Sequence, residues 1–343
     1  MGSPGGRSIH RWRLTLAGAA VLAMLAAAPV GAHASGQQPT AGAETGAGSG
    51  SPAPGAGTAG RAFVLEKGHF TTFSTPFGDI GGDGIGINDR GDIVSGYFSG
   101  PGATSCVRAF LRDRNGRFTR IDFPADGTTY LFDINDRGQM VGDFFPSVTP
   151  GSCSDLGPPQ AFVRDGRGRF TTIPIPGAQL VEAFGINNLG QVVGQYDTAD
   201  GVAHGYVLDC GRMTTVDGPP GATGASVLDI NDSGQMVGGY VDAAGAPHAF
   251  SLSHGRYTTI DAPGAPFTFP FGVNDQGQIA GFTERTLPLG DVHGFVLRDG
   301  AGGPFTPVDV PGAVLGTLVG DINNDGVVVG LYRTPAPGTA AVT

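Results

Sequence analysis

Lysine is almost absent from this chain of 343 residues, because Lys67 is the only one. All charged residues together make up 15% of the sequence, and aspartate plus glutamate outnumber lysine plus arginine by 30 to 20. Nucleic-acid binding needs clustered basic side chains that neutralise phosphates. A formal net charge of −10 therefore leads us to expect no nucleic-acid partner.

Long apolar runs are missing as well. The longest stretch, residues 14–28, is shorter than the roughly 20 residues of a membrane-spanning helix. Three arginines precede it and Ala-His-Ala follows at 32–34, an arrangement typical of a secretory signal peptide with its cleavage site. We predict a signal peptide over residues 1–34, with an uncleaved membrane anchor as the alternative. The mature chain is expected to be extracellular or periplasmic, without membrane contact after cleavage.

The segment 35–60 has no large apolar side chain. Such a composition, rich in Gly, Ala, Pro and Ser, cannot bury enough surface to offset the entropy lost on ordering. We predict a disordered linker there and a disordered tail over 334–343. The folded domain is expected to span residues 61–333.

Glycine, in contrast, is abundant, with 61 residues, and much of it recurs at fixed places. The words "DINDRGQMVGDF" at 133–144, "GINNLGQVVGQY" at 185–196 and "DINDSGQMVGGY" at 229–240 are close copies. A second word, such as "HAFSLSHGRYTTID" from residue 248, alternates with them. Six such units follow one another at spacings of 43 to 52 residues, which indicates a repeat architecture.

Each unit predicts four short strands in two hairpins, because β-prone stretches alternate with turns that contain Asn, Asp and Gly. The turn of the second hairpin begins with Asn, whose side chain can bond the backbone two residues later. Gly follows three residues on, where positive φ is needed. We expect these turn residues to be structural: Asn88, Asn135, Asn187, Asn231, Asn274, Asn323, Gly91, Gly138, Gly190, Gly234, Gly277 and Gly326. Another Gly inside the next strand, such as Gly142, indicates close approach of a neighbouring backbone.

Four strands in about 45 residues match the size of a propeller blade, so six units predict an all-β fold, a six-bladed β-propeller. Two blade registers are open. We favour the one in which the first hairpin completes a blade with the last, because this joins the chain ends and protects the ring. The alternative fold is a β-solenoid or another open repeat array, which needs capping ends that neither terminus provides.

The repeated words also resemble a known family. "HAF" at 248–250, "TTIDAPGA" at 258–265 and the recurring "IND.G..VG" resemble the HAF repeats of predicted extracellular bacterial proteins. The resemblance covers most of the folded part. Local departures are Tyr206 in place of Phe, and Asn188 and Asn324 in place of Asp. It implies export and a repeat fold, and it carries little about function.

Metal chemistry finds little support in the sequence. Residues 321–326 space three oxygen ligands and a Gly like the start of a calcium loop, but Tyr332 stands where that loop needs a Glu. His204, His248 and His293 share one repeated slot that Arg and Gln fill in other units. A repeated hydrogen bond is the simpler interpretation of that slot. We expect no metal and no cofactor.

Enzyme chemistry is weakly indicated. Asp122, Asp217, Asp261 and Asp309 recur after one strand of most units, which favours a role in the fold over a glycosidase carboxylate pair. No nucleophile elbow, zinc-protease motif or phosphate loop occurs. The acids that an enzyme could use lie in irregular segments, namely Asp143, Asp155, Glu284 and Asp291.

The three cysteines divide into a pair and a single residue. Cys106 and Cys153 fall in corresponding loops of adjacent units, and an exported compartment permits a disulfide between them. Cys210, in the turn "DCGR", is then left as an unpaired thiol or as the site of an intermolecular link.

Aromatic residues near strand ends are candidate ligand contacts, with packing between blades as the alternative use: Phe144, Phe145, Tyr196, Phe267, Phe269 and Phe271. We predict a secreted, monomeric, non-enzymatic propeller that binds an extracellular protein or a glycan at its loop face. The first alternative is a secreted propeller enzyme that acts on glycans as a hydrolase or lyase. The second is a structural envelope or matrix protein.

Overall fold

A computed structural model describes residues 58–99, 106–153, 155–285, 291–314 and 316–335. The predicted signal peptide, most of the predicted linker and nearly all of the predicted tail lie outside the described residues. Apart from one three-residue 3-10 turn, η1 (Gly300–Gly302), every regular element in the described ranges is a β-strand. Within those ranges no helix has the length and apolarity to span a membrane.

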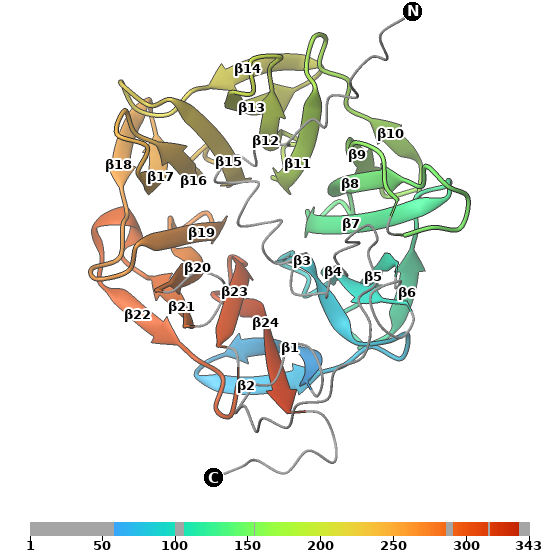
Figure 1. Cartoon of the computed structure of the whole chain (residues 1–343). Coiled ribbons are helices and arrows are strands. Elements are labelled where there is room, and N and C mark those ends of the chain that lie inside the picture. The colour runs from blue at the N-terminus through green and yellow to red at the C-terminus, as the bar shows by residue number, and fades with distance from the viewer. Residues whose placement is uncertain (1–57, 100–105, 154, 286–290, 315, 336–343) are drawn as a thin grey trace, which may run out of the picture.

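The strands form six antiparallel four-stranded blades around a central channel (Figure 1). A single parallel residue pair, Val181 opposite Gln160, joins the second and third blades into one eight-stranded sheet. Each blade is described from its innermost to its outermost strand. Blade 1 holds β3 (Ile80–Ile87), β4 (Ile93–Phe98), β5 (Val107–Arg112) and β6 (Phe118–Ile121). Blade 2 holds β7 (Gly127–Ile134), β8 (Met140–Pro146), β9 (Gln160–Arg164) and β10 (Phe170–Thr172). Blade 3 holds β11 (Leu180–Ile186), β12 (Val192–Asp197), β13 (Ala203–Asp209) and β14 (Arg212–Val216).

The second half of the ring repeats this order. Blade 4 holds β15 (Gly224–Ile230), β16 (Met236–Val241), β17 (Pro247–Ser253) and β18 (Arg256–Thr259). Blade 5 holds β19 (Phe267–Val273), β20 (Ile279–Glu284), β21 (Val292–Leu297) and β22 (Phe305–Val308). Blade 6 holds β23 (Thr317–Ile322), β24 (Val328–Pro335), β1 (Thr58–Glu66) and β2 (His69–Phe73).

Blade 6 closes the ring, because it takes two strands from each end of the chain. β24 pairs with β1 along eight residue pairs, from Thr58 opposite Pro335 to Leu65 opposite Val328. The favoured blade register is therefore confirmed, and so is the six-bladed propeller. A closed ring excludes the solenoid alternative, since an open array would leave the first and last repeats unpaired.

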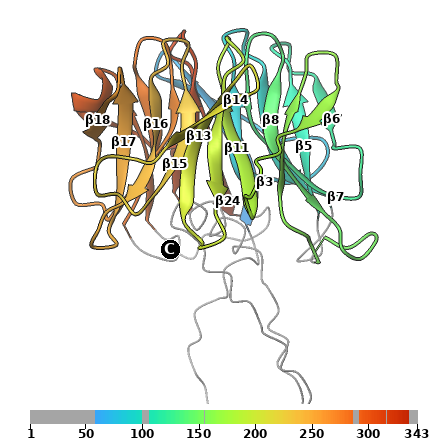
Figure 2. The ribbon, with the colours of Figure 1, turned by 90° about the horizontal axis from the view of Figure 1, so that it is seen from above.

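The two faces of the ring differ in how they connect strands (Figure 2). The turn face carries the tight turns between first and second strands and between third and fourth strands. The loop face carries the connections from second to third strand and from each blade to the next, and both ends of the described chain leave there.

Glycine inside the second strands has the role that the sequence predicts. A Cβ atom on Gly142 would lie 2.0 Å from the carbonyl oxygen of Tyr130 in the adjacent first strand, and Gly194 and Gly281 are equally tight. An aromatic ring of the third strand fills the space above the glycine. Phe250, which is fully buried, lies over Gly238 in this way. Small and large side chains thus alternate to give the dense packing of a core.

Candidate functional site

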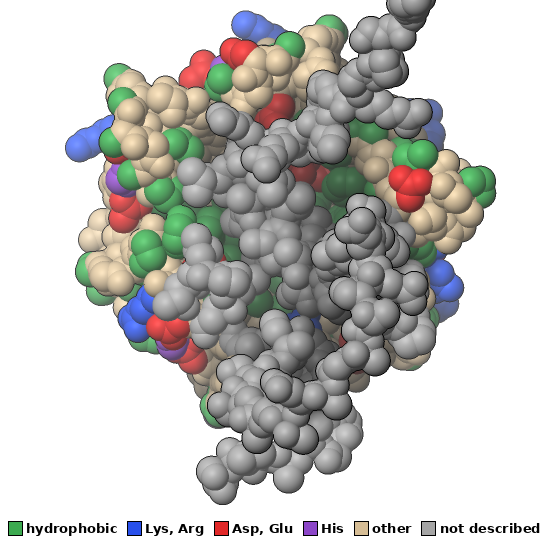
Figure 3. Space-filling view, in the orientation of Figure 1, with side chains coloured by type: hydrophobic (Ala, Val, Ile, Leu, Met, Phe, Trp, Pro, Cys, Tyr) green, Lys and Arg blue, Asp and Glu red, His purple; other side chains and the backbone are tan. Residues whose placement is uncertain are grey.

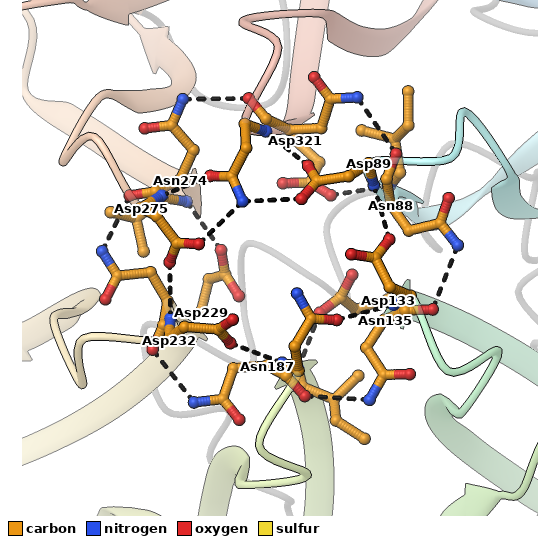
Figure 4. A pocket seen from close by; sticks show the side chains of 18 of the residues that line it. Asn88, Asp89, Asp133, Asn135, Asn187, Asp229, Asp232, Asn274, Asp275 and Asp321 are labelled. Carbon is orange, nitrogen blue, oxygen red and sulfur yellow. Dashed lines mark hydrogen bonds between the residues drawn. The ribbon is translucent and has the colours of Figure 1, made fainter.

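The six predicted turn asparagines form a closed ring at the turn-face end of the channel (Figure 4). Each Oδ1 atom accepts backbone N–H groups of its own turn, as Asn88 does from Arg90 at 3.1 Å and Asp92 at 2.9 Å. Each Nδ2 atom donates to the carbonyl oxygen of the corresponding Asn in the next blade. These bonds measure 2.8 to 3.1 Å, and the one from Asn323 to Asn88 closes the circle. We call this set the asparagine ring.

The turn glycines complete these turns, with φ between 70° and 86°. That left-handed conformation strains any other residue type, so the turn chemistry has the form expected from the sequence. Sequence reasoning missed the contacts between blades. It assigned each Asn to its own hairpin, although the same amide also links its blade to the next.

A second ring lies directly beside the first. Its members follow the asparagines in sequence: Asp89, Asp136, Asn188, Asp232, Asp275 and Asn324. The backbone N–H of each donates to the side-chain Oδ1 atom of the next, at 2.7 to 3.0 Å, again around the whole circle. Asp and Asn both provide this acceptor. Asn188 and Asn324 can therefore replace Asp without loss of the ring.

A third set of residues alternates around the channel. Asp133, Asp229 and Asp321 belong to blades 2, 4 and 6, while the same position in blades 1, 3 and 5 is Gly. Asp229 accepts the N–H of Ile230 at 2.7 Å and that of Val273 in the next blade at 2.7 Å. The other two aspartates make the same pair of bonds.

Glycine is required between these aspartates. A Cβ atom on Gly185 would lie 2.7 Å from Oδ1 of Asp229 and 2.9 Å from its Cα, and a Cβ on Gly272 would be 2.5 Å from Oδ1 of Asp321. The six innermost strands therefore have the same backbone geometry, but at this position Asp and Gly alternate, so the side chains repeat only three times around the channel. The sequence shows this alternation in "FDIND", "LDIND" and "GDINN" against "GIGIND", "FGINN" and "FGVND".

Burial raises the pKa of all three aspartates. The pKa of Asp133 rises to about 6, and Asp229 and Asp321 rise well above their usual range because of burial and their mutual repulsion. Backbone N–H donors partly oppose this shift. Each carboxylate is already used by two such donors. In the described part of the chain, no three His, Cys, Asp or Glu side chains are placed to hold a metal ion. The cavity at this end of the channel is about 70 Å³.

The other part of the channel is filled by apolar side chains. A β-bulge interrupts the pairing of the innermost strands, for example between Leu131 and Asp133 and between Ala183 and Gly185. The bulged residues Phe132 and Phe184 contact each other edge to face at 5.4 Å. Leu228, Phe271 and Ile85 complete the lining, and the remaining cavity is only about 20 Å³. The channel thus leaves no room for a sizeable ligand.

The aromatic residues predicted to contact a ligand are mostly used in packing. Phe144 is 2% exposed and stacks on Phe123 with ring centroids 4.4 Å apart, so its predicted role as an exposed contact is wrong. Phe145 is half-buried and packs on Tyr130. Phe267 is half-buried and stacks on Phe269, a ring-to-ring distance of 6.4 Å.

The loop acids proposed for an enzyme are not brought together. Asp143 and Glu284 are buried, Asp291 is half-buried and Asp155 is exposed. Asp143 and Asp155 belong to blade 2, and Glu284 and Asp291 belong to blade 5, which lies on a different side of the ring (Figure 1). Asp291 is further engaged by His293, with its Oδ1 atom 2.8 Å from Nε2.

Two sets that the sequence kept separate, the repeated histidines and the repeated aspartates, meet as pairs. His204 lies 2.6 Å from Asp217, His248 lies 2.6 Å from Asp261 and His293 lies 3.1 Å from Asp309. The pairs tie the third strand to the end of the fourth in blades 3, 4 and 5.

Stacking on a tyrosine supports two of these histidines. Tyr196 stacks on His204 with ring centroids 5.3 Å apart, and Tyr240 stacks on His248 at 5.0 Å. Their acidic partners raise the pKa of His248 and His293. The repeated slot therefore holds the hydrogen bond expected from the sequence. The side chain of Tyr196, a predicted ligand contact, is half-buried, and His204 covers one side of its ring.

The cysteines occupy the positions that the sequence suggested. Cys106 and Cys153 form a disulfide between blades 1 and 2, with their Cα atoms 5.0 Å apart. Cys210 is an exposed free thiol in a turn where its φ is 49°. The disulfide joins the second-to-third connections of two neighbouring blades on the loop face.

A much larger cavity, of about 610 Å³, lies on the side wall between blades 3 and 4. We call it the lateral groove. Apolar side chains line part of it, namely Val207, Val216, Met236 and Leu252, together with the half-buried Tyr257, whose ring packs on Phe250. Polar side chains line the rest, namely Gln191, Asp209, Arg212, His254 and Asp217.

The next blade boundary shows why this groove is open. Between blades 4 and 5 the 3-10 turn η1 contacts β18, and its Ala301 packs against the core with Phe305. No comparable insertion stands in the described turn between β17 and β18, the blade 4 turn that faces β14 across this boundary. The only sequence signal was turn length, since "RDGAGGPF" in blade 5 is longer than "DCGR" and "SHGR". Sequence reasoning did not use that difference and missed the groove.

No protein-family model matches the sequence, and no curated protein does. Among solved structures the chain is similar to a putative TolB from Agrobacterium tumefaciens. That match has a TM-score of 0.51 and 14% identity, and it covers 82% of this chain and 99% of that one. TolB from Acinetobacter baumannii matches with a TM-score of 0.49 and 13% identity over 74% and 65% of the two chains.

A fungal lectin from Aleuria aurantia, described as a six-bladed β-propeller with a fucose recognition mode, is a weaker match. Its TM-score is 0.42 and its identity 12%, over 76% of this chain and 96% of that one. Identities this low show the fold alone, a six-bladed β-propeller, and leave function to be argued from the site.

Proposed function

We propose that the chain is a secreted, non-enzymatic binding protein that holds a carbohydrate in the lateral groove. The observation that carries this proposal is the groove itself, about 610 Å³ in volume and lined by both apolar and hydrogen-bonding side chains. Ligand sites commonly combine an apolar lining with a few polar groups that fix orientation. Sugar rings offer an apolar face and several hydroxyl groups, and Tyr257 with Arg212, Gln191 and Asp209 complements both.

Export is supported by the disulfide between Cys106 and Cys153 together with the predicted signal peptide. Disulfides persist in oxidising compartments and are rare in the cytosol. The resemblance to HAF repeats, which implies export, points the same way.

An enzyme in the groove is disfavoured by the positions of its acids. Asp209 and Asp217 precede and follow β14, which separates them by about 17 Å at 3.3 Å per residue. Glycosidases place their two carboxyl groups about 5 to 10 Å apart. Both acids are also engaged, Asp209 by Gln191 at 3.1 Å and Asp217 by His204 at 2.6 Å.

A glycan array probed with the full secreted chain, followed by calorimetry on the best glycan, tests this proposal. Tyr257→Ala and Arg212→Ala should each weaken binding by about tenfold or more, because each removes one wall of the site. Arg256→Ala is the matched control. Arg256 has the place in blade 4 that Arg212 has in blade 3, and it lies outside the groove.

Binding should occur without product release. Glycan cleavage would contradict the non-enzymatic assignment, and equal affinity in all three variants would show that the groove is not the carbohydrate-binding site. A peptide library probed with the same proteins tests the protein alternative, since selective loss of peptide binding in the groove variants would replace the carbohydrate assignment.

A further inference from the structure

Arginine is distributed very unevenly around this acidic ring. Eight arginines lie in or beside the turn-face turns of blades 1 and 2: Arg90, Arg112, Arg114, Arg117, Arg137, Arg164, Arg167 and Arg169. The corresponding places in blades 3 to 6 hold four cations: Lys67, Arg212, Arg256 and Arg298. We call the first group the arginine cluster. The loop face, in Figure 3, shows Lys and Arg mainly along the rim outside the grey area.

Acids do not cancel the charge of the cluster. The same turns of blades 1 and 2 hold five acids, Asp89, Asp92, Asp113, Asp136 and Asp165, so eight minus five leaves a charge of +3. The turns of blades 3 to 6 hold six acids, Glu66, Asp209, Asp232, Asp275, Asp299 and Asp325, so four minus six leaves −2. A locally positive surface therefore stands on a chain whose net charge is −10.

The acids within the cluster are committed to the backbone. Asp113 accepts the N–H groups of Asn115 and Arg117, both at 2.9 Å. Asp165 accepts those of Arg167 and Arg169 at 3.0 and 2.8 Å. These bonds fix the turns from which the arginines project, and the bonds to the backbone lower the pKa of Asp165.

The arginines of the two blades form one continuous surface. A Cβ atom added to Gly138, in blade 2, would lie 3.6 Å from Nη2 of Arg90 in blade 1. A Cβ added to Gly91 would lie 3.7 Å from the Cβ of Arg114. A Cβ added to Gly166, in the outer turn of blade 2, would lie 2.6 Å from the carbonyl oxygen of Arg137. Inner and outer turns of both blades are thus in contact.

Most of the guanidinium groups are available to a ligand. Arg90 pairs with Asp92 at 2.9 Å, and Arg112 and Arg164 lie over the rings of Phe73 and Phe170. The other five are exposed, and within the described residues they make no ion pair closer than 4 Å: Arg114, Arg117, Arg137, Arg167 and Arg169.

We propose that the arginine cluster binds an acidic polysaccharide through its uronic-acid carboxylates. A guanidinium is a planar fork that matches a carboxylate with two parallel hydrogen bonds, which a lysine ammonium cannot do. The cluster crosses a blade boundary on an open surface. Such a surface fits an extended polymer with repeated charges better than a small anion, which needs an enclosing pocket.

Single-stranded nucleic acid fits the cluster less well. Its binding sites combine basic side chains with exposed aromatic rings on which bases stack. The nearest rings here, Phe73, Phe118 and Phe170, are half-buried, and two of them are covered by arginine side chains. Carboxylated sugars need no stacking platform. This site is separate from the lateral groove, and the two proposals stand or fall independently.

The test is binding of the full secreted chain to immobilised polygalacturonate, a polymer of uronic acid, at low and at physiological salt. The triple variant Arg114→Ala, Arg137→Ala, Arg167→Ala should lower the affinity by about tenfold or more. The matched control is Lys67→Ala, Arg256→Ala, Arg298→Ala, which makes the same charge change on the same face of blades 4 to 6. It should change the affinity by less than about twofold. All six side chains are exposed, so both variants should retain the melting temperature of the parent.

Equal losses in the two triple variants would show a response to net charge and overturn the assignment to the cluster, as would no loss in either. Tighter binding to single-stranded DNA than to polygalacturonate would overturn the polysaccharide assignment. Tyr257→Ala, which alters only the lateral groove, should leave polygalacturonate binding unchanged. Failure of the groove proposal and failure of this one therefore give different results.

Discussion

The asparagine ring and the outer turns belong to the same blades, yet they differ in how much they vary. All six inner turns place an Asn and a positive-φ Gly at the same points and make the same bonds to the next blade. The outer turns also each hold a positive-φ Gly, but they share no Asn and no repeated bond to the next blade. They carry arginines in blades 1 and 2, border a groove in blade 3 and form an inserted 3-10 turn in blade 5. Invariant residues hold the ring together, and ligand contacts are free to evolve where the repeat is broken.

The inner ring is itself less uniform than its asparagines indicate. Asp133, Asp229 and Asp321 link blade 2 to 3, blade 4 to 5 and blade 6 to 1, whereas the other three boundaries have a glycine packed against an aspartate. Two consecutive blades thus form the true repeating unit at the channel. An aspartate in every blade would clash with its neighbours, and a glycine in every blade would leave backbone N–H groups without an acceptor.

Removing one member of the asparagine ring is the most direct test of the contrast between this ring and the outer turns. Asn187→Ala deletes the bond to Asn231 at 3.1 Å and the bond to Gln191 at 2.7 Å, and it leaves two backbone N–H groups without their acceptor. Each lost hydrogen bond costs about 1 kcal/mol, and the buried bond to Asn231 costs more, so we expect a loss of about 3–5 kcal/mol in the free energy of unfolding. Urea unfolding followed by circular dichroism measures it.

Two further variants test the source of that loss. Asn187→Asp keeps the acceptor for the backbone N–H groups but sets a carboxylate oxygen against the oxygens of Asn231 and Gln191, so it should lose about as much as Asn187→Ala. Asn115→Ala, at an exposed outer turn, should change stability by less than about 0.5 kcal/mol. Similar losses at Asn187 and Asn115 would contradict the contrast between inner ring and outer turns.

The disulfide is the strongest expected contribution outside the inner ring. Cys106 and Cys153 close a loop with a sequence separation of 47 residues. Loss of such a cross-link enlarges the unfolded ensemble and typically costs about 2–4 kcal/mol. The double variant Cys106→Ser, Cys153→Ser should show this loss in urea unfolding, measured with Cys210→Ser as background. If reductant lowers the stability of the parent and of the double variant equally, the cross-link is not its cause.

The Asp and Gly alternation offers a smaller effect with a cleaner control. Gly185→Ala places a Cβ atom within 2.9 Å of both Asp229 and the carbonyl oxygen of Leu228. Overpacking of this kind costs about 1–3 kcal/mol. Gly302→Ala, where no atom lies within 4 Å of the added Cβ, should have almost no effect on the melting temperature. A well-tolerated Gly185→Ala would mean that the alternation has no packing cause.

How far the sequence could lead is clear from these residues. The length of the repeat and its turn signals predict a six-bladed ring. The chain begins with the first hairpin of a unit and ends with the second, which predicts how the ring closes. Both features depend on contacts within one repeat or between repeats that are neighbours in the ring. The amide bond from Asn187 to Asn231 was not evident, since it joins repeats across a boundary that has no sequence signature. The arginine cluster was not evident from composition, because a net charge of −10 describes the whole chain. The eight arginines come together only when the inner and outer turns of blades 1 and 2 fold side by side.

Stability should fall as the pH rises through the range in which the three channel aspartates ionise. Their pKa in the folded state is raised above 3.8, to about 6 for Asp133, so the folded state holds protons that the unfolded state releases. The stabilisation is therefore present at low pH and lost as the pH rises through the folded pKa values. Asp165 and Asp200 have a lowered pKa and oppose this trend only at more acidic pH.

Melting temperature measured from about pH 5 to about pH 8 should accordingly decline by several degrees. Asp133→Asn should flatten the decline, since one titrating group is gone, even though the variant is less stable at every pH because it loses an acceptor for Ile186. The quantity to compare is the change in melting temperature per pH unit in the parent and in the variant. An unchanged slope would show that Asp133 does not titrate in this range.

The outer histidine pairs define the smallest expected effect. His248 lies 2.6 Å from Asp261 and 3.4 Å from Asp242, and its side chain is 27% exposed, so solvent screens both pairs. His248→Ala should therefore cost only about 0.5–1 kcal/mol. The acidic partners raise the pKa of His248 above 6.5, so its contribution is fully present below that value and is lost as the pH rises through the raised pKa. The loss on substitution should accordingly be larger near pH 5 than near pH 8, whereas His69→Ala, at an exposed position of β2, should show no such difference. A loss at His248 as large and as independent of pH as that at Asn187 would place the histidine pairs among the contacts that hold the ring together.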